Sequence, residues 1–513
     1  MLCAMFAFPK SGFRANTCFY AWFVIGQVYL VAYSNAYVLD QKIAGYSWYN
    51  YLIQGWFVER RMARQYNYFR EPLYPGILGE LGEHFDSYAN AALLISSLSL
   101  SLSSLFIGLA TWKLLPKNGA FWGGVASVLL YGTPAMLESS RWGNHYSLLM
   151  MGSAIAFWGF STASRTSIPA ALSVALLCSI DQRAILWIIP VVLLHFFSGD
   201  KLWKKIAQSL FSVFLIVLIP RMFRVYFSED SKHRLSLEQV LEFQRDVVQR
   251  WSLGDDRQLT MMCRELNQSD FLQLSFLPTD CAQAILSHNW WKQLPQFMPF
   301  SMNLYAVLTL ILLLLSFFSS GQARRGIYAL FAFLQVYFWA RIMPLPIRYL
   351  PSIAIVLIPI FPLCLGVIEE KMNSFRWGFR LMVALCCFFY FYPDQDENRQ
   401  RSTFRQQEQT EYWTFWQQFQ KQYTEGDRFL DCSEMGLNSL ILPKKYVRQP
   451  FHQTRRQKEC SDWIVEGSGT WIFLSPNSAE IQVARESSNW RESIRYKERI
   501  IAFENISPPK SEK

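Results

Sequence analysis

The chain has 513 residues, of which 51% are hydrophobic and 16% aromatic, while only 17% are charged. An ordinary soluble domain carries about 25% charged residues, and runs of about 20 apolar residues are typical of membrane helices. The composition therefore excludes a soluble enzyme, a disordered chain and a disulfide-rich miniprotein. The net charge of +10 does not point to nucleic acid as a partner, because membrane proteins collect Lys and Arg in their cytoplasmic loops.

Apolar blocks predict about eleven membrane-spanning helices, which makes the fold class an all-α polytopic membrane protein. The fifth and sixth blocks are short, and we interpret them as a hairpin that turns at Asp181-Gln182-Arg183. Merging these two blocks would reverse the orientation of every later helix. The predicted spans are residues 17–37, 88–112, 120–136, 146–163, 167–180, 184–198, 206–220, 302–320, 326–340, 349–368 and 379–393.

Basic residues in alternate connections set the predicted orientation, because short cytoplasmic loops are rich in Lys and Arg. Lys201, Lys204 and Lys205 follow the short hairpin and support counting two spans there. The N-terminus is then inside and the C-terminus outside. The first span also resembles a signal sequence that ends at Ser34-Asn35-Ala36, but we expect it to be retained.

Three polar regions then lie outside the membrane. Residues 38–87 and 221–301 are predicted as exterior loops of a transmembrane domain over residues 1–393, and residues 394–513 as an exterior soluble domain. This last domain is expected to be a small α/β unit, with helix over 402–425 and strand-like alternation in GTWIFLSP and AEIQVARE. It could bind the acceptor or act as a structural lid, and the sequence favours neither.

The ten cysteines divide between membrane and exterior segments. Cys263 and Cys281 fall in the middle exterior loop, and Cys432 and Cys460 in the C-terminal domain. Two cysteines in each exterior segment suggest two disulfides formed in an oxidising compartment, although four unpaired thiols are the alternative. The spacings do not resemble zinc ligands, so we predict no metal centre.

The first exterior loop begins with a carboxylate at the end of the first span, Asp40. It is either a plain interfacial charge or a functional group at the mouth of a groove reached from water and from lipid. Residues 45–64 have the spacing of an interfacial amphipathic helix. Tyr68-Phe69-Arg70-Glu71-Pro72-Leu73-Tyr74-Pro75 follows, and its two prolines predict an extended turn before the second span.

Two further exterior segments combine charged and aromatic groups. Glu138, Arg141 and His145 lie between the third and fourth spans, where they either cap a short turn or face a substrate. Arg348 and Tyr349 begin the tenth span, where they are either a phosphate site or a snorkelling arginine beside an interfacial tyrosine. A last group before the second span is a weak metal candidate and consists of Glu80, Glu83, His84 and Asp86.

This layout resembles the GT-C superfamily of membrane glycosyltransferases. An aspartate ending span one, an amphipathic helix and YFREPLYP before span two are similar to the protein O-mannosyltransferase, aminoarabinose transferase (ArnT) and RgtA-like branches. LLCSIDQRAILWIIPVVLL and IRYLPSIAIVLIPIFPL are similar to later motifs, with Arg183 at the usual Lys/Arg position. The resemblance covers residues 17–393 and extends to an exterior C-terminal domain.

The resemblance implies transfer of a sugar from a polyprenyl-phosphate carrier with inversion at the anomeric carbon. Asp40 would be the general base towards the acceptor hydroxyl, and Arg348 would hold the lipid phosphate. Glu138 would help to place the acceptor, and Tyr74 would line the groove beside the carrier headgroup. The remaining residues expected around the donor and substrate are Arg70, Arg141, His145 and Tyr349.

Gln41 after Asp40 departs from the two adjacent acids of the protein mannosyltransferases. This favours a bacterial branch that modifies lipid or polysaccharide, in the inner membrane with its site facing the periplasm. The expected partners are the lipid-linked donor, the bilayer and an acceptor glycan, lipid or protein, with no cofactor and no nucleic acid. The alternatives are a transporter or lipid-linked oligosaccharide flippase, which would need charged or broken helices at the midplane, and an inactive scaffold.

Overall fold

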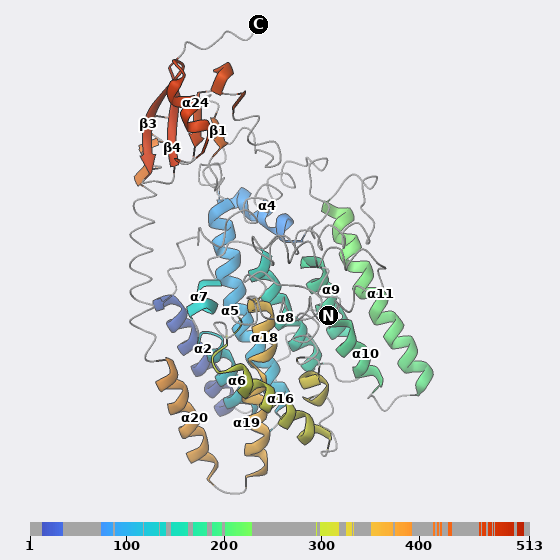
Figure 1. Ribbon diagram of the computed structural model, residues 1–513. Coiled ribbons are helices and arrows are strands. Elements are labelled where there is room, and N and C mark those ends of the chain that lie inside the picture. The colour runs from blue at the N-terminus through green and yellow to red at the C-terminus, as the bar shows by residue number, and fades with distance from the viewer. Residues whose placement is uncertain are drawn as a thin grey trace, which may run out of the picture.

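The computed structural model shows a helical bundle with a small β-sheet beyond one end (Figure 1). We call the end of the bundle nearer the sheet the sheet end, and the opposite end, where α19 ends and α20 begins, the far end. The residues that the structure describes are 13–33, 73–85, 88–115, 117–132, 134–139, 145–162, 168–181, 187–196, 201–227, 294, 298–317, 325–330, 332, 350–372, 375–391, 414–415, 418–419, 421–422, 429–432, 461–462, 464–467, 470–474, 476, 478–496 and 500–506.

Most helices follow the predicted apolar blocks, with bounds shifted by a few residues. The helix at 73–85 falls in a predicted exterior loop instead, and most of the span predicted at 326–340 lies outside the described residues. In chain order they are α2 (Phe13–Tyr33), α4 (Leu73–Phe85), α5 (Tyr88–Leu114), α6 (Gly119–Leu129), α7 (Pro134–Ser139), α8 (His145–Thr162), α9 (Ile168–Ile180), α10 (Ile188–Phe196), α11 (Leu202–Phe227), α16 (Met302–Phe317), α18 (Leu350–Leu357), α19 (Ile360–Lys371) and α20 (Arg376–Phe391). The disputed blocks do form two separate helices, α9 and α10, as the hairpin interpretation requires.

The chain is an integral membrane protein, but the number of about eleven spans is not confirmed. Among the described residues, three segments are long and apolar enough to cross a membrane: Ala91–Leu114, Leu202–Phe223 and Leu350–Lys371. The other described apolar helices are shorter than this. The outer face of α11 is lined by exposed apolar side chains such as Leu210 and Phe214, as expected of a helix in contact with lipid.

Three predictions about the helices are wrong, each in a segment that contains a proline. The predicted span 120–136 is broken, because α6 ends at Leu129 and a separate helix, α7, begins at Pro134. The span predicted to end at residue 220 continues through Pro220 to Phe227. The extended turn predicted at Pro75 is instead the first turn of α4, where a missing backbone N–H costs nothing.

Close packing of small residues holds α5 against α6. Gly108 of α5 and Gly123 of α6 face each other so closely that a Cβ atom on Gly123 would lie 2.5 Å from the Gly108 carbonyl oxygen. Small residues at helix crossings let the backbones approach in this way. A buried polar contact joins the same helices to α2, since Gln27 donates to the Tyr131 hydroxyl over 2.8 Å and accepts from Ser101 over 2.8 Å.

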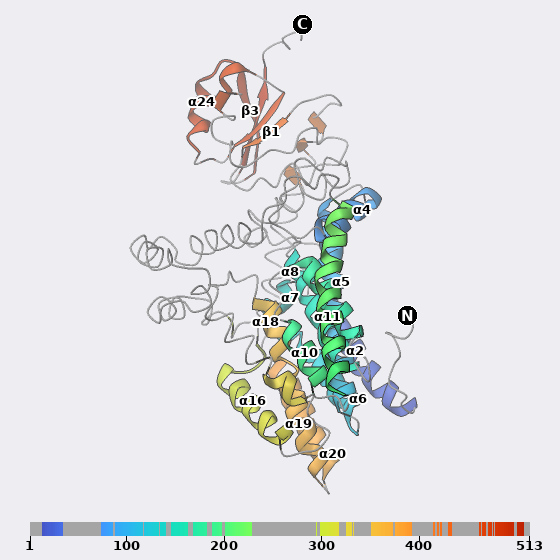
Figure 2. The same cartoon turned by 90° about the vertical axis from the view of Figure 1, so that its right-hand side faces the viewer.

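The sheet has four strands in the order β1-β2-β4-β3. The strands are β1 (Phe429–Cys432), β2 (Trp471–Leu474), β3 (Trp490–Tyr496) and β4 (Ile500–Asn505). β1 pairs with β2 in parallel, and the other pairs are antiparallel. Figure 2 shows the sheet beyond α4, with α24 (Glu480–Glu486) packed on it.

The C-terminal segment therefore combines helix and sheet, and GTWIFLSP contains strand β2 as predicted. The strand expected in AEIQVARE is wrong, because these residues form α24. Ile481 and Ala484, three residues apart, are buried on one face of the helix. Gln482 Nε2 donates a hydrogen bond to Glu486 Oε1, one turn later, over 2.7 Å. The domain boundary at residues 393 and 394 stays a prediction.

Candidate functional site

The described part of the first exterior region is helix α4, which packs on α5. Tyr74 lies in its first turn and is fully buried. Tyr74 is therefore held by the core at the point where α4 begins, and only a shape change of the surroundings would open it to a carrier lipid. Asp40 and Arg70, the other predicted site residues of this region, lie outside the described residues.

Helix α4 also carries two members of the weak metal candidate. Glu80 and His84 are both exposed and stand four residues apart, on one face of the helix. No group of three potential metal ligands occurs within the part of the chain that the structure describes.

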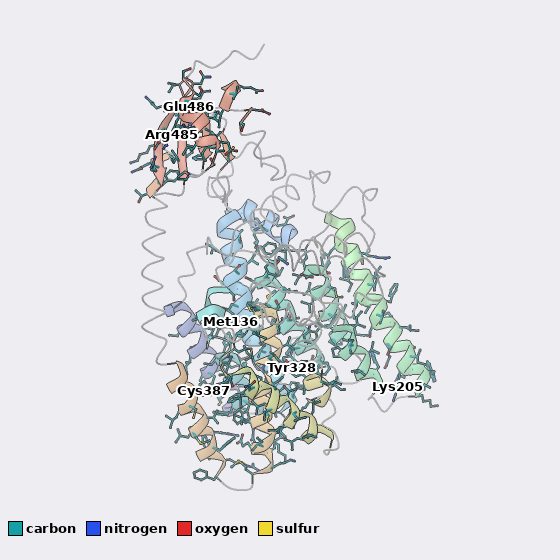
Figure 3. All side chains as sticks on the ribbon, viewed as in Figure 1. Met136, Lys205, Tyr328, Cys387, Arg485 and Glu486 are labelled. Carbon is teal, nitrogen blue, oxygen red and sulfur yellow. The ribbon has the colours of Figure 1, made fainter. Side chains whose placement is uncertain are left out.

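The second exterior segment is built around helix α7, whose backbone carries Glu138. Serines fix the end of this helix. The Ser139 hydroxyl donates to the Met136 carbonyl oxygen over 2.6 Å, and the Ser147 hydroxyl in the first turn of α8 donates to the Ser139 carbonyl oxygen over 2.9 Å. Figure 3 shows Met136 nearer the sheet end than Cys387. The α7 backbone is thus bonded to the start of α8, while Arg141 lies outside the described residues.

His145, the first residue of α8, is buried and faces a carboxylate from another helix. Its Nε2 atom lies 3.6 Å from Oδ2 of Asp181, and the two side chains are only 4% and 5% exposed. The ring of Tyr146 lies against the imidazole, with centroids 3.8 Å apart. Asp181 directly follows the last residue of α9, so this contact joins the start of α8 to the end of α9.

The third predicted segment, Arg348-Tyr349, directly precedes a helix that the structure describes. Arg348 and Tyr349 lie outside the described residues, and α18 begins at the next residue, Leu350. α18 packs along α8, the helix that His145 begins. In sequence, Arg348 therefore lies two residues before α18, the helix that contacts α8.

A second cluster of buried charges lies at the far end and was not anticipated from the sequence. Glu369 of α19 is fully buried and accepts hydrogen bonds from Trp122 Nε1 over 2.6 Å and from Arg380 Nε over 2.7 Å. Beside it, Arg325 donates to both oxygens of Glu370, over 3.1 and 3.3 Å, and through Nε to the Leu114 carbonyl oxygen over 2.7 Å. We call these residues the far-end charge cluster. From the sequence alone, Arg325 and Arg380 are only two of the basic residues in the alternate connections that set the predicted orientation.

Of the four cysteines in the predicted disulfides, only Cys432 is among the residues that the structure describes. Cys432 ends strand β1 and is disulfide-bonded. Cys263, Cys281 and Cys460 lie outside the described residues, so the pairing of Cys432 with Cys460 stays a prediction. The cysteines of the described helices, among them Cys178 and Cys364, are free thiols.

Comparison with known proteins finds similarity in structure but not in sequence. No protein-family model matches the sequence, and no curated protein sequence matches it. The structure of ArnT from Cupriavidus metallidurans bound to undecaprenyl phosphate superposes with a TM-score of 0.60 at 12% identity, over 95% of this chain and 98% of that chain. The chain has the fold of ArnT. ArnT is one of the relatives that the sequence motifs resemble, so the expected fold is confirmed.

The chain is also similar to two other solved structures. The apo state of ArnT from Cupriavidus metallidurans gives a TM-score of 0.58 at 12% identity, over 97% of this chain and 100% of that chain. The archaeal oligosaccharyltransferase AglB from Archaeoglobus fulgidus, in complex with an inhibitory peptide and a dolichol-phosphate, gives a TM-score of 0.46 at 11% identity, over 92% of this chain and 71% of that chain.

Proposed function

We propose that this chain is an integral membrane glycosyltransferase that transfers a hexosyl or pentosyl group from a polyprenyl-phosphate carrier to an exterior acceptor. The observation that carries the proposal is the ArnT-like fold, which extends over 95% of the chain in a comparison with a structure that holds undecaprenyl phosphate. The position of Asp40 at the end of the first apolar block adds to it, since a carboxylate there can be reached from water and from lipid.

The chemistry requires two groups that the sequence supplies. Asp40 takes the proton of the acceptor hydroxyl while that oxygen attacks the anomeric carbon, which inverts its configuration. The bond between the anomeric carbon and the phosphate oxygen breaks, and the carrier leaves as an anion. Arg348 binds that phosphate through its planar guanidinium and stabilises the charge that develops on it. No metal is part of this proposal, because Arg348 provides the cation.

The surrounding residues have supporting roles in the same proposal. Glu138 orients the acceptor, and Arg70, Arg141 and Tyr349 line the path of the carrier headgroup, which buried Tyr74 joins only after its surroundings change shape. The site faces the exterior, which for a bacterial inner membrane is the periplasm, and the acceptor is a lipid, polysaccharide or protein. The C-terminal α/β segment is proposed to lie on that same side, and its position beyond the sheet end of the bundle (Figure 1) is compatible with this.

The experiment that tests this proposal measures release of polyprenyl phosphate from a panel of polyprenyl-phosphate sugars by the purified protein. We expect Asp40→Asn to lower the rate about 10³-fold, within the range for loss of a general base. Glu80→Gln is the matched control, because Glu80 is an exposed carboxylate on α4. Equal release by wild type and Asp40→Asn would remove Asp40 from this role. Absence of release from every donor, with lipid movement in a flipping assay, would favour the transporter instead.

A further inference from the structure

The contact between His145 and Asp181 joins two helices at the sheet end of the bundle. Nε2 of the imidazole and Oδ2 of the carboxylate are 3.6 Å apart, a separation that suits an electrostatic contact better than a direct hydrogen bond. Both side chains are almost completely buried. A buried ionisable group in a membrane protein is costly unless it is paired, so this pair calls for a specific role.

The same turn of α8 also holds helix α7. Ser147, two residues after His145, donates to the carbonyl oxygen of Ser139, the last residue of α7. Ser139 in turn donates back to Met136 within α7. The end of α9, the first turn of α8 and the end of α7 are therefore connected through polar contacts in one continuous series.

We propose that His145 and Asp181 are a positioning pair that fixes α8 against α9 and thereby sets the place of α7 and its residue Glu138. The role of Glu138 in transfer rests on the function proposed above, whereas the mechanical connection does not. In this arrangement His145 acts through the backbone of α7 and makes no contact with substrate. A displacement of about 1 Å in a catalytic group can cost about 10²-fold in rate, so such a pair controls activity from a distance.

The bundle contains a second buried histidine that provides a matched control. His195 of α10 is 3% exposed, and its Nε2 atom lies 3.1 Å from the hydroxyl oxygen of Ser212 in α11. This pair also joins two helices, but the Ser212 hydroxyl is neutral, and the pair is not part of the described series of contacts that leads from α9 through α8 to α7. Replacement of either histidine by asparagine removes a buried imidazole of the same size, and only one replacement breaks the series that leads to Glu138.

The first test is independent of enzymatic activity. A cysteine introduced at position 138 by Glu138→Cys is labelled with a membrane-impermeant maleimide, and its labelling rate is followed by mass spectrometry of the peptide that contains position 138. We expect His145→Asn and Asp181→Asn to change the labelling rate in the same direction and by a similar factor, and His195→Asn to leave it unchanged. An unchanged rate in the first two variants, or an equal change in His195→Asn, would overturn the proposal.

The second test is kinetic and uses the full-length wild-type background. We expect His145→Asn and Asp181→Asn each to lower kcat for transfer by about 30- to 100-fold, and to change the KM for the lipid-linked donor far less, because the donor phosphate is bound elsewhere. Asp181→Glu keeps the carboxylate and should recover most of kcat. A kcat that matches His195→Asn would overturn the positioning role. If the wild type transfers no sugar, the proposed function fails, and the labelling rates still decide whether the pair fixes α7.

Discussion

The two ends of the bundle bury charge in different ways. At the far end, Glu369 accepts short hydrogen bonds from Trp122 and Arg380, and Arg325 forms a two-pronged contact with Glu370. At the sheet end, Nε2 of His145 and Oδ2 of Asp181 are 3.6 Å apart. The far end has charge-assisted hydrogen bonds of 2.6 to 3.3 Å, whereas the His145–Asp181 contact is longer and lies close to the helix that carries Glu138.

This difference indicates what each end contributes. A buried ion pair with good hydrogen bonds adds little net stability compared with an apolar contact, yet it penalises any arrangement that separates its members. The far-end charge cluster therefore fixes α5, α6, α19 and α20 in one register. At the sheet end, the start of α8 is hydrogen-bonded to α7, which carries Glu138 of the proposed site, so there a polar contact can influence chemistry as well as register.

Glu369→Gln at the far end is expected to cause the largest loss of stability and so tests the difference between the two ends most directly. The change keeps the shape of the side chain but leaves Arg380 without its anion, and breaking a partly buried pair in this way costs about 3 kcal/mol. The midpoint of thermal unfolding in detergent should fall accordingly, while kcat of the remaining folded protein stays the same. Glu486→Gln on the exposed face of α24 is the control. A loss of kcat without a loss of stability would show that the far end also influences chemistry.

An intermediate effect is expected from Gly123→Ala, which tests packing instead of charge at the far end. The new Cβ atom would lie 2.5 Å from the Gly108 carbonyl oxygen, and a backbone atom cannot move aside alone. Overpacking of this kind costs about 2 kcal/mol. Gly378→Ala is the matched control, because its Cβ would meet the ring of Phe375, which is 78% exposed and free to rotate. Equal thermal stability for both variants would contradict the close helix contact.

The sequence predicted the elements better than the contacts between them. Apolar runs located the helices, and Asp181-Gln182-Arg183 correctly separated α9 from α10. The partner of Asp181 was not predicted, because His145 lies on another helix and the aspartate was interpreted only as a turn residue. A carboxylate within an otherwise apolar pair of helices was the available signal. The far-end charge cluster was beyond reach, since Trp122 and Glu369 are 247 positions apart in the chain.

In the C-terminal segment, local pattern was informative for strand β2 and misleading for α24. Alternation of apolar and polar residues over a few positions fits either element, and the packing of Ile481 and Ala484 on the sheet decided for helix. Two candidate site residues, Tyr74 and His145, are buried in the structure, whereas the sequence suggested that they contact substrate. Burial depends on neighbours from distant segments, and a single sequence does not specify those neighbours.

The smallest effect is expected in the sheet, where charge pairs are exposed. Arg491 of β3 donates to Glu504 of β4 over 2.9 Å, but the two side chains are 65% and 33% exposed. Water screens such a pair and its side chains keep their freedom, so Arg491→Ala should cost at most about 0.5 kcal/mol. The thermal midpoint should barely move at low salt and not at all at high salt. A drop as large as that of Glu369→Gln would contradict the comparison, because it would mean that burial does not decide how much a charge pair matters in this protein.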